Sequence, residues 1–181
     1  LKPSNLTFEE SAAVPLAAVT ALQALRDKGE LQKGHHVLIY GASGGVGTFA
    51  VQIAVAFGAE VTAVTSSRNI ELVRSLGAHR VIDYTKEELT KDGQIYDIFL
   101  DVVGKTSFWQ SKRFLRPRGK FVIVSPTFRD LFPIVWTLLA GGTVRPKART
   151  LLTKLCAEDI NLLTSLIESG KINVIIDRYY D

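Results

Sequence analysis

The sequence contains no methionine and a single cysteine, Cys156, among its 181 residues. Because translation starts at methionine and this chain starts at Leu1, we expect the 181 residues to be a piece of a longer protein. A lone cysteine excludes an intrachain disulfide and a zinc site built from several cysteines. It also favours a reducing compartment, so we predict a cytoplasmic protein. The ordinary role of such a cysteine is that of a small apolar residue in a helix.

Long hydrophobic runs are also missing. The most apolar run, Leu131–Ala140, includes Pro133, and a membrane-spanning helix needs about 20 apolar residues. The sequence therefore predicts no transmembrane segment, no signal peptide and no membrane partner. Two interpretations of this run stay open: it packs in the core of the chain, or it covers a sheet edge or contacts a second copy in a homodimer.

Charge of either sign is modest. The chain has 22 Lys and Arg against 18 Asp and Glu, and 46% of its residues are hydrophobic. This composition excludes disordered and collagen-like chains and fits one globular domain over residues 1–181. The segment Lys105–Lys120 has basic residues and no acidic one. Its aromatic residues are spaced for packing on a sheet, so we interpret the segment as a solvated face and predict no nucleic-acid partner.

Short β-branched runs alternate with longer amphipathic runs along most of the chain. The expected strands are residues 37–40, 61–65, 80–83, 95–101, 120–125 and 148–152, and the expected helices are residues 46–57, 69–76, 86–90, 107–115 and 158–169. A further helix within residues 1–34, capped by Ser4 or Thr7, docks before the first strand. Alternating strands and helices imply parallel pairing with right-handed crossovers. The predicted fold is therefore α/β, a doubly wound parallel sheet of the Rossmann type with about six strands.

A cluster of glycines follows the first expected strand. Four of the 14 glycines fall within residues 41–47, at the start of a helix. A dinucleotide fold needs a tight turn here, backbone that approaches a pyrophosphate without a Cβ in the way, and a close helix-to-strand contact. Gly44 and Gly47 suit the second and third roles, whereas Ala42 stands at the first glycine position. We expect backbone N–H groups around Gly45 to hold a pyrophosphate, and no lysine follows Gly47 as a P-loop would require.

An acidic residue is missing where NAD-binding proteins usually carry one. About 20 residues after the glycines, an Asp or Glu ordinarily accepts hydrogen bonds from the adenosine ribose. Residues 61–70 hold no acid, and the strand ends in Thr65, Ser66, Ser67 and Arg68. Hydroxyls and a guanidinium suit a 2′-phosphate, so the sequence favours NADP (NADPH) as the cofactor. The alternative is that the serines cap the next helix and Arg68 is a solvated charge.

Four groups of short motifs follow one another along nearly the entire chain. They are Ala13-Val14-Pro15-Leu16 with Thr20-Ala21, then Ala42-Ser43-Gly44-Gly45-Val46-Gly47, then Leu76-Gly77-Ala78 with Ile82-Asp83-Tyr84, and then Tyr96-Asp97 with Asp101-Val102-Val103-Gly104. In this order they resemble the medium-chain dehydrogenase/reductase superfamily, most closely its zinc-independent quinone oxidoreductase branch. The resemblance implies a GroES-like substrate-binding domain that is missing from this chain. Residues 172–181 would be the start of the segment that leads the polypeptide back into that domain.

The resemblance also implies which positions bind the cofactor. The pyrophosphate would lie at the glycine turn, on Ser43, Gly44, Gly45, Val46 and Gly47. The adenosine phosphate would face Thr65, Ser66, Arg68 and Tyr84. The nicotinamide half would lie near Thr20, Val103, Val124, Ser125 and Thr127. Tyr84 taken alone is equally well explained as a surface aromatic residue.

Metal ligands and catalytic side chains are not expected. Zinc-using relatives take one ligand from the segment that matches Val14–Ala18, which has no Cys, His, Asp or Glu. His35, His36 and His79 suit solvent-facing loop positions. Hydride transfer asks the protein mainly to orient the nicotinamide and exclude water, so catalytic residues stay unassigned.

The resemblance implies an activity for the full-length protein. It is the NADPH-dependent reduction of a quinone or of an α,β-unsaturated carbonyl, with little turnover by the isolated chain. Two alternatives stay open: an enoyl-reductase domain of a larger synthase, and a nucleotide-binding Rossmann module without catalysis.

Overall fold

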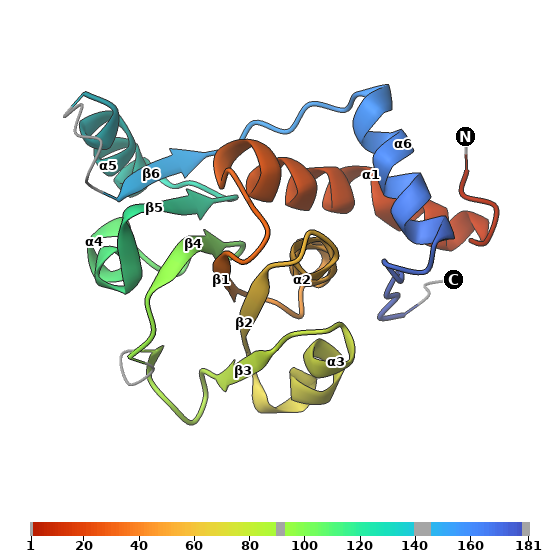
Figure 1. Ribbon diagram of the computed structural model, residues 1–181, viewed down its shortest axis with the longest axis horizontal. Helices are drawn as coiled ribbons and strands as arrows, with labels where there is room; N and C mark the ends of the chain where they lie inside the picture. The colour runs from red at the N-terminus through yellow and green to blue at the C-terminus, as the bar shows by residue number, and fades with distance from the viewer. Residues whose placement is uncertain (1, 90–92, 140–145, 179–181) are drawn as a thin grey trace.

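Six strands form one parallel sheet in a computed structural model that describes residues 2–89, 93–139 and 146–178 (Figure 1). The strands are β1 (His36–Tyr40), β2 (Glu60–Thr65), β3 (Arg80–Asp83), β4 (Tyr96–Asp101), β5 (Leu115–Ile123) and β6 (Lys147–Thr150). Their order in the sheet is β3-β2-β1-β4-β5-β6. The predicted doubly wound Rossmann sheet is therefore confirmed. The strand order reverses between β1 and β4, which is where such sheets bind ligands.

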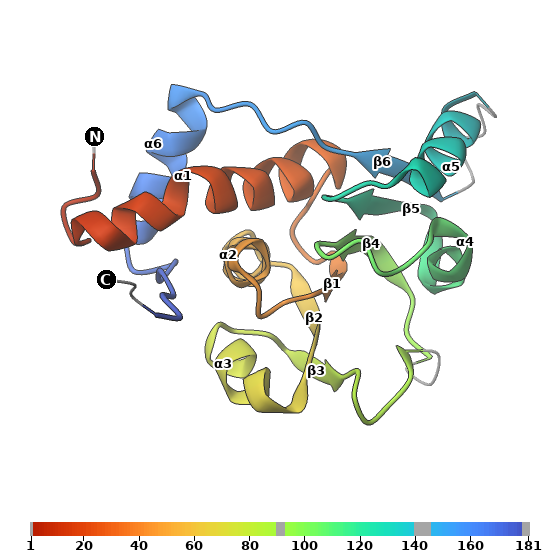
Figure 2. The same ribbon diagram turned by 180° about the vertical axis from the view of Figure 1, so that it is seen from behind.

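Helices cover both faces of the sheet (Figures 1 and 2). They are α1 (Phe8–Gln23), which continues as the π-helix Ala24–Lys28, α2 (Gly45–Ala56), α3 (Ile70–Ser75), α4 (Phe108–Ser111), α5 (Phe128–Leu139) and α6 (Ala157–Glu168). Helices α1, α2, α3 and α6 lie on one face, and α4 and α5 lie on the other. Among the described helices, none has the length and apolar character that crossing a membrane requires.

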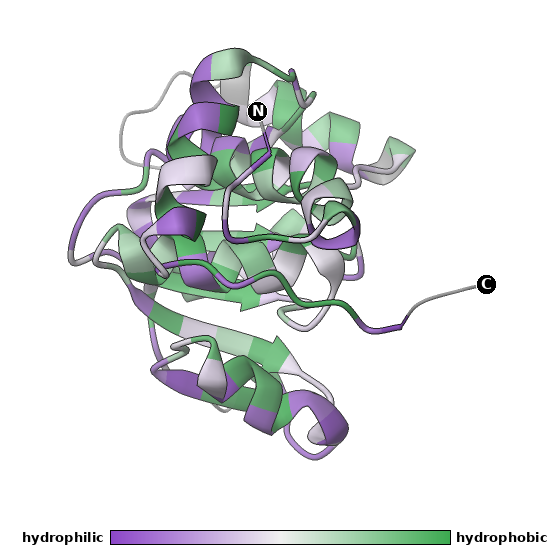
Figure 3. Cartoon of the chain, turned by 90° about the vertical axis from the view of Figure 1, so that its right-hand side faces the viewer, coloured by the Kyte–Doolittle hydropathy of each residue, from purple (hydrophilic) through white to green (hydrophobic). Residues whose placement is uncertain are grey.

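The central strands are buried on both sides. Val37 and Ile39 of β1 belong to the core cluster under α1 and α2, while Leu38 packs on the opposite face with Phe99 and Phe121. Such strands need apolar side chains at successive positions, and for this reason their sequences are continuous hydrophobic runs. Figure 3 shows the strands mostly in hydrophobic colours.

The N-terminal helix begins with a capping box. Thr7 Oγ1 accepts a hydrogen bond from Glu10 N at 3.2 Å, and Thr7 N donates to Glu10 Oε2 at 2.8 Å. Of the two expected caps, Thr7 is therefore the one used. Ser4 instead donates from its backbone N and its hydroxyl to Glu168 of α6, each at 2.8 Å. The start of the chain is thus tied to its last helix.

The prediction of a helix over residues 86–90 is wrong for residues 86–88, which are not helical, whereas Leu89 has 3₁₀ geometry. The N–H groups of Lys86 and Glu87 both donate to the carbonyl of Asp83 at 3.0 Å, and Thr85 N donates to its carboxylate. These bonds close a turn directly after β3. Thr90 lies outside the described residues.

The expected helix over residues 107–115 is also too long. Helix α4 ends at Ser111, a 3₁₀ turn covers Lys112–Phe114, and β5 begins at Leu115 rather than at residue 120. Leu115 already pairs with Tyr96 of β4, with a register irregularity before the pairs that follow. Strand pairing therefore overrides the local helical pattern.

The segment after α6 returns across α2. Gln52 Nε2 donates to the carbonyl of Asn173 at 2.9 Å, and Asn173 N donates to Gln52 Oε1 at 2.7 Å. Val174 still packs against the core, and after it the described part of the chain extends away from the other elements (Figure 3). Residues 179–181 of the predicted return segment lie outside the described residues.

Candidate functional site

Two glycines make the turn between β1 and α2 possible. Gly41 has a φ of +87°, and a Cβ there would lie 2.3 Å from Cγ2 of Val103. A Cβ on Gly47 would lie 2.2 Å from the carbonyl oxygen of Gly41 and 2.8 Å from the backbone of Ala42. Gly41 therefore supplies the tight turn in place of Ala42, and Gly47 allows the close helix-to-strand contact that the sequence predicts.

The other two glycines of the turn leave open space. A Cβ on Gly45 would meet nothing within 4 Å, and one on Gly44 would meet only the carbonyl of Gly41 at 3.5 Å. Gly44 caps α2 without a side chain, and the first turn of α2 has no acidic residue. The first N–H groups of a helix have no partner inside it. Exposed backbone and unpaired donors at this point fit a phosphate group.

A cavity of about 380 Å³ lies beside this turn. It is lined by Tyr40, Gly41, Ser43, Gly44, Thr65, Ser66, Arg68, Asn69, Tyr84, Val103 and Lys105. The structure thus brings together seven predicted residues: Ser43, Gly44, Thr65, Ser66, Arg68, Tyr84 and Val103. Sequence reasoning missed Tyr40, Asn69 and Lys105. Tyr40 ends β1 and Lys105 follows β4, so the rule that ligands bind at the carboxyl ends of strands could have found both.

Three side chains on the β2 side of the cavity form a hydrogen-bonded cluster. Thr65 Oγ1 donates to Ser43 Oγ at 2.9 Å, and Asn69 Nδ2 donates to the same oxygen at 3.0 Å. Thr65 is buried, so its hydroxyl contacts Ser43 rather than the open cavity. Ser43 is therefore the residue of this cluster that presents a hydroxyl to a ligand.

A carboxylate lies close to this site and is already occupied. Asp83, at the end of β3, accepts hydrogen bonds from the Ser67 hydroxyl and from the backbone N and hydroxyl of Thr85. The Ser67 hydrogen bond, followed by those of Thr85, lowers the pKa of Asp83 to about 2. The Ser67 hydroxyl thus already donates its proton to Asp83. Within the described ranges, Arg68 and Lys105 form no ion pair, so both cations remain available at the cavity.

A second buried carboxylate holds the loop after β4. Asp101 Oδ1 accepts from the N–H groups of Val103 and Gly104 at 2.9 and 2.8 Å, and Oδ2 accepts from the N–H and hydroxyl of Thr106. Asp101 is fully buried. The four bonds fix the loop so that Val103 and Lys105 line the cavity opposite β2.

Of the five residues predicted for the nicotinamide half, Val103 lines this cavity and the other four do not. Thr20 is buried in α1, with its hydroxyl 3.0 Å from that of Thr153. Val124, Ser125 and Thr127 follow the carboxyl end of β5, where Val124 N donates to the carbonyl of Asp101 at 3.0 Å. These four residues do not line the 380 Å³ cavity. The structure therefore divides the predicted site into two groups of residues.

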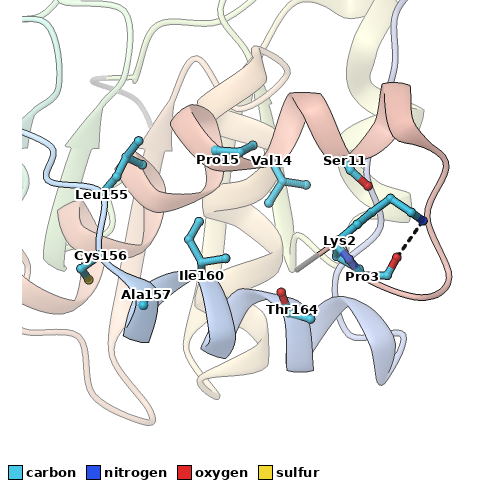
Figure 4. Close-up of a pocket in the computed structure, with 10 residues that line it drawn as sticks. All are labelled: Lys2, Pro3, Ser11, Val14, Pro15, Leu155, Cys156, Ala157, Ile160 and Thr164. Atoms are coloured by element: carbon cyan, nitrogen blue, oxygen red, sulfur yellow. Dashed lines mark hydrogen bonds between the residues drawn. The ribbon is translucent and has the colours of Figure 1, made fainter.

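Another cavity, of about 500 Å³, lies between α1 and α6 (Figure 4). Val14, Pro15, Leu155 and Ile160 give it an apolar lining. Cys156 also lines it and directly precedes α6 as an exposed residue, so the expectation of a small apolar residue within a helix is wrong. None of the predicted cofactor-binding residues lines this cavity.

The described side chains form no group that suits a zinc ion. In residues 2–89, 93–139 and 146–178, no three His, Cys, Asp or Glu side chains are grouped closely enough to hold a metal. His36 lies 3.6 Å from Glu60, and a site needs three or four such ligands.

Comparisons with known proteins agree with this geometry. Residues 45–146 match the family described as zinc-binding dehydrogenase. The human protein named NAD(P)H oxidoreductase RTN4IP1, mitochondrial, is 45% identical over 99% of this chain and 51% of its own length. The solved structure of the quinone oxidoreductase from Coxiella burnetii has a TM-score of 0.86 and 32% identity, covering 98% of this chain and 54% of that one.

A third similarity is to an enzyme of a different name. The structure of CurK enoyl reductase has a TM-score of 0.77 and 27% identity, covering 97% of this chain and 56% of that one. The chain spans about half the length of the curated relatives it matches. With its six-stranded parallel sheet, its glycine turn and its match over residues 45–146, the chain belongs to the medium-chain dehydrogenase/reductase superfamily, on its quinone oxidoreductase-like branch.

Proposed function

We propose that the chain is the NADP(H)-binding domain of a zinc-independent oxidoreductase that transfers hydride to a quinone or an α,β-unsaturated carbonyl. The observation that carries this proposal is the 380 Å³ cavity at the carboxyl ends of β1, β2 and β4. It is lined by the hydroxyls of Ser43 and Ser66 and by two cations, Arg68 and Lys105, and none of the described residues brings a carboxylate to it. A phosphorylated adenosine ribose needs donors and positive charge, whereas an unphosphorylated one is usually held by an acid.

The chain's own residues bind and orient the dinucleotide. A bound nicotinamide dinucleotide would itself supply the hydride. The N–H groups at the start of α2 hold the pyrophosphate, and Gly44 and Gly45 let its oxygens approach the backbone. Arg68 and Ser66 hold the adenosine phosphate. Val103 and Val124 exclude water beside the dinucleotide, and no side chain is assigned a proton transfer.

The substrate-binding half of the protein is proposed to lie outside this chain. Its relatives are about twice as long, and the chain's helix α1 packs within the domain through Ala18, Val19 and Leu22. We assign residues 1–34 to docking on the cofactor domain and residues 172–181 to the start of the return to a GroES-like domain. The isolated chain is expected to bind NADP(H) with little turnover.

The resemblance to CurK enoyl reductase favours a second candidate, an enoyl-reducing domain of a larger synthase. A nucleotide-binding module without catalysis is the third. The reading frame on either side of the 181 residues distinguishes them: GroES-like halves support a free enzyme, and synthase domains support the second candidate. The compartment also stays a prediction, since the human relative is named as mitochondrial.

Calorimetry on the 181-residue chain tests the cofactor. We expect NADPH to bind at least about tenfold more tightly than NADH, because one hydrogen-bonded charge contact is worth about 1.5 kcal/mol or more. Equal affinities would contradict NADP specificity, and no binding of either nucleotide would contradict the proposed function. Robust reduction of benzoquinone by the isolated chain would contradict the assignment of the substrate site to a missing domain.

We also propose that a second copy of the chain covers α5. Its side chains Phe128, Leu131, Phe132, Val135 and Leu139 are exposed along one face. The opposite face is fixed to the sheet edge, where Ala148 N of β6 donates to Thr137 Oγ1 at 3.2 Å. Of the two interpretations of this run, packing in the core does not describe the exposed face. Exposed apolar surface beside an edge strand is typical of a protein interface.

The basic segment Lys105–Lys120 is still proposed to have no nucleic-acid partner. The Lys112 ammonium lies 4.7 Å from the ring centroid of Trp109, and Arg116 Nη1 lies 3.3 Å from Asp97 Oδ1. Part of the segment forms β5 within the sheet. These charges therefore have intramolecular roles.

A further inference from the structure

We propose that the Ser43 hydroxyl donates its hydrogen bond to the phosphate of the adenosine ribose, and that Thr65 and Asn69 position it for this role. This inference rests on the proposed function and deepens it, because it names a hydrogen-bond donor that distinguishes a phosphorylated adenosine ribose from an unphosphorylated one. The sequence interpretation instead placed Ser43 among the residues that hold the pyrophosphate.

The hydrogen bonds of Ser43 determine where its proton points. A serine hydroxyl has one proton to donate and two lone pairs to accept. Thr65 Oγ1 and Asn69 Nδ2 both donate to Ser43 Oγ, at 2.9 and 3.0 Å. Both lone pairs are therefore in use, and Ser43 can only donate to any further partner. In the part of the chain that the structure describes, Ser43 has no acceptor for this proton.

Its partners place this donor on the adenosine side of the site. Thr65 ends β2, and Asn69 closes the 3₁₀ turn Ser67–Asn69 that contains Arg68. In a doubly wound fold, the end of the second strand is where the adenosine ribose is recognised. Ser43 lines the same cavity as Ser66 and Arg68. Its fixed proton therefore belongs to the group of donors at the ribose.

The chemistry of these donors selects a phosphate over a hydroxyl. A ribose hydroxyl has a proton of its own and is best bound where a carboxylate accepts it. The carboxylate at the end of β3, Asp83, is occupied by Ser67 and Thr85. Ser43, held as a donor only, suits an oxygen that carries negative charge and accepts without donating. Because Thr65 is buried and fixes the hydroxyl before a ligand arrives, the bond to phosphate needs little reordering.

The first experiment compares ligands with and without the phosphate. Calorimetry on the 181-residue chain uses NADPH and NADH, and adenosine 2′,5′-bisphosphate and 5′-AMP as fragments. We expect Ser43→Ala to weaken NADPH and the bisphosphate about tenfold to a hundredfold, as for a hydrogen bond to a charged group. Affinities for NADH and 5′-AMP should change less than about twofold. Equal loss for NADPH and NADH would mean a pyrophosphate contact and would overturn the inference.

The second experiment tests the positioning residues. Thr65→Val keeps the shape of the side chain and removes its donor, whereas Thr65→Ser keeps the donor. We expect Thr65→Val to lower the NADPH-to-NADH affinity ratio and Thr65→Ser to restore it. In a Ser43→Ala background, Thr65→Val should change the ratio no further, because both substitutions remove one interaction. A purely structural role would lower the melting temperature and leave the ratio unchanged, which would overturn the positioning role.

A third variant keeps the test valid if the buried Thr65→Val does not fold. Asn69 is half-buried, and Asn69→Leu removes the other donor to Ser43. We expect Asn69→Leu to lower the NADPH-to-NADH affinity ratio as Thr65→Val does. In a Ser43→Ala background, Asn69→Leu should leave this ratio unchanged. If the unaltered chain binds neither nucleotide, the proposed function fails and this inference with it. If the unaltered chain prefers NADPH and Ser43→Ala keeps that preference, only this inference fails.

Discussion

Arg26 and Asp159 join the end of the first helical segment to α6 through an ion pair of 2.6 Å between Nη1 and Oδ1. Asp159 is 2% exposed, and its other oxygen accepts from Gln23 Nε2 at 2.7 Å. The hydrogen bond from Arg26 lowers the pKa of Asp159, helped by that from Gln23. A carboxyl whose pKa is lowered on folding stabilises the fold above its unfolded pKa, and this contribution is lost as the pH falls through the folded pKa.

Removing the charge of Asp159 should destabilise the chain in a pH-dependent way. We expect Asp159→Asn to cost about 2 kcal/mol at pH 7, because Arg26 and Gln23 lose a charged acceptor in a buried place. The difference from the unaltered chain should shrink as the pH falls below about 4, where the unfolded carboxyl takes up its proton. Urea unfolding of both proteins between pH 7 and about pH 3 measures this difference in the free energy of unfolding.

A matched control comes from the same arginine. Asp27 also pairs with Arg26 at 2.6 Å, but its side chain is half-exposed. Asp27→Asn should therefore cost less than about 1 kcal/mol. A loss of stability for Asp159→Asn that stays constant down to pH 2 would contradict the assigned charge interaction.

The glycine turn offers two substitutions with opposite expected effects. Gly47→Ala puts a Cβ against the backbone of Gly41 and Ala42, so it should destabilise the fold by about 1–3 kcal/mol, as overpacking does. Gly44→Ala meets only an ordinary contact at 3.5 Å. It should keep nearly the same melting temperature but weaken NADPH binding, because in the proposed binding mode its methyl group would face the pyrophosphate. Thermal unfolding and calorimetry separate the two effects. A stable Gly47→Ala, or a Gly44→Ala that binds normally, would contradict these roles.

The sequence predicted the sheet because each of its signals is local. Apolar runs mark strands buried on both sides, and the glycine turn stands between a strand and a helix. One error occurs where a distant partner decides: Leu115 extends β5 because it pairs with Tyr96, and a short window of sequence does not reveal this pairing. The other error is local, since the N–H groups of Lys86 and Glu87 close a turn on the carbonyl of Asp83.

The candidate site was predicted on one side better than on the other. Thr65, Ser66 and Arg68 are neighbours in sequence, so their common place in the cavity could be predicted. Lys105 lies far along the chain and reaches the cavity only because β4 and β2 flank β1. Helix α5 shows a related limit. Periodicity identifies its apolar residues but not whether that face points to the core or to solvent.

Arg68 is expected to control the choice of dinucleotide. It is exposed, lines the cavity and forms no ion pair within the described residues. Arg68→Ala should weaken NADPH binding about tenfold to a hundredfold and leave NADH binding nearly unchanged. The matched comparison is Lys105→Ala, which removes a cation from the opposite wall of the cavity. It should weaken NADPH binding less, because a lysine ammonium is a point charge without the fixed pair of donors of a guanidinium. If Arg68→Ala leaves the ratio of NADPH to NADH affinity unchanged, the result would contradict this role and favour the interpretation of Arg68 as a solvated charge.

The exposed face of α5 should determine the oligomeric state. Phe132 is 66% exposed near the middle of this face, and the Trp136 ring lies 5.6 Å from that of Trp109 of α4, tilted by 54°. Phe132→Glu places a charge in the proposed contact, so we expect it to convert a dimer into a monomer without lowering the melting temperature of the monomer. Leu152→Glu is the control, because Leu152 is 87% exposed in the segment after β6 and should leave the dimer intact. Sedimentation equilibrium measures both variants. An unaltered chain that stays monomeric at every concentration, or a Leu152→Glu variant that dissociates as Phe132→Glu does, would place the contact elsewhere.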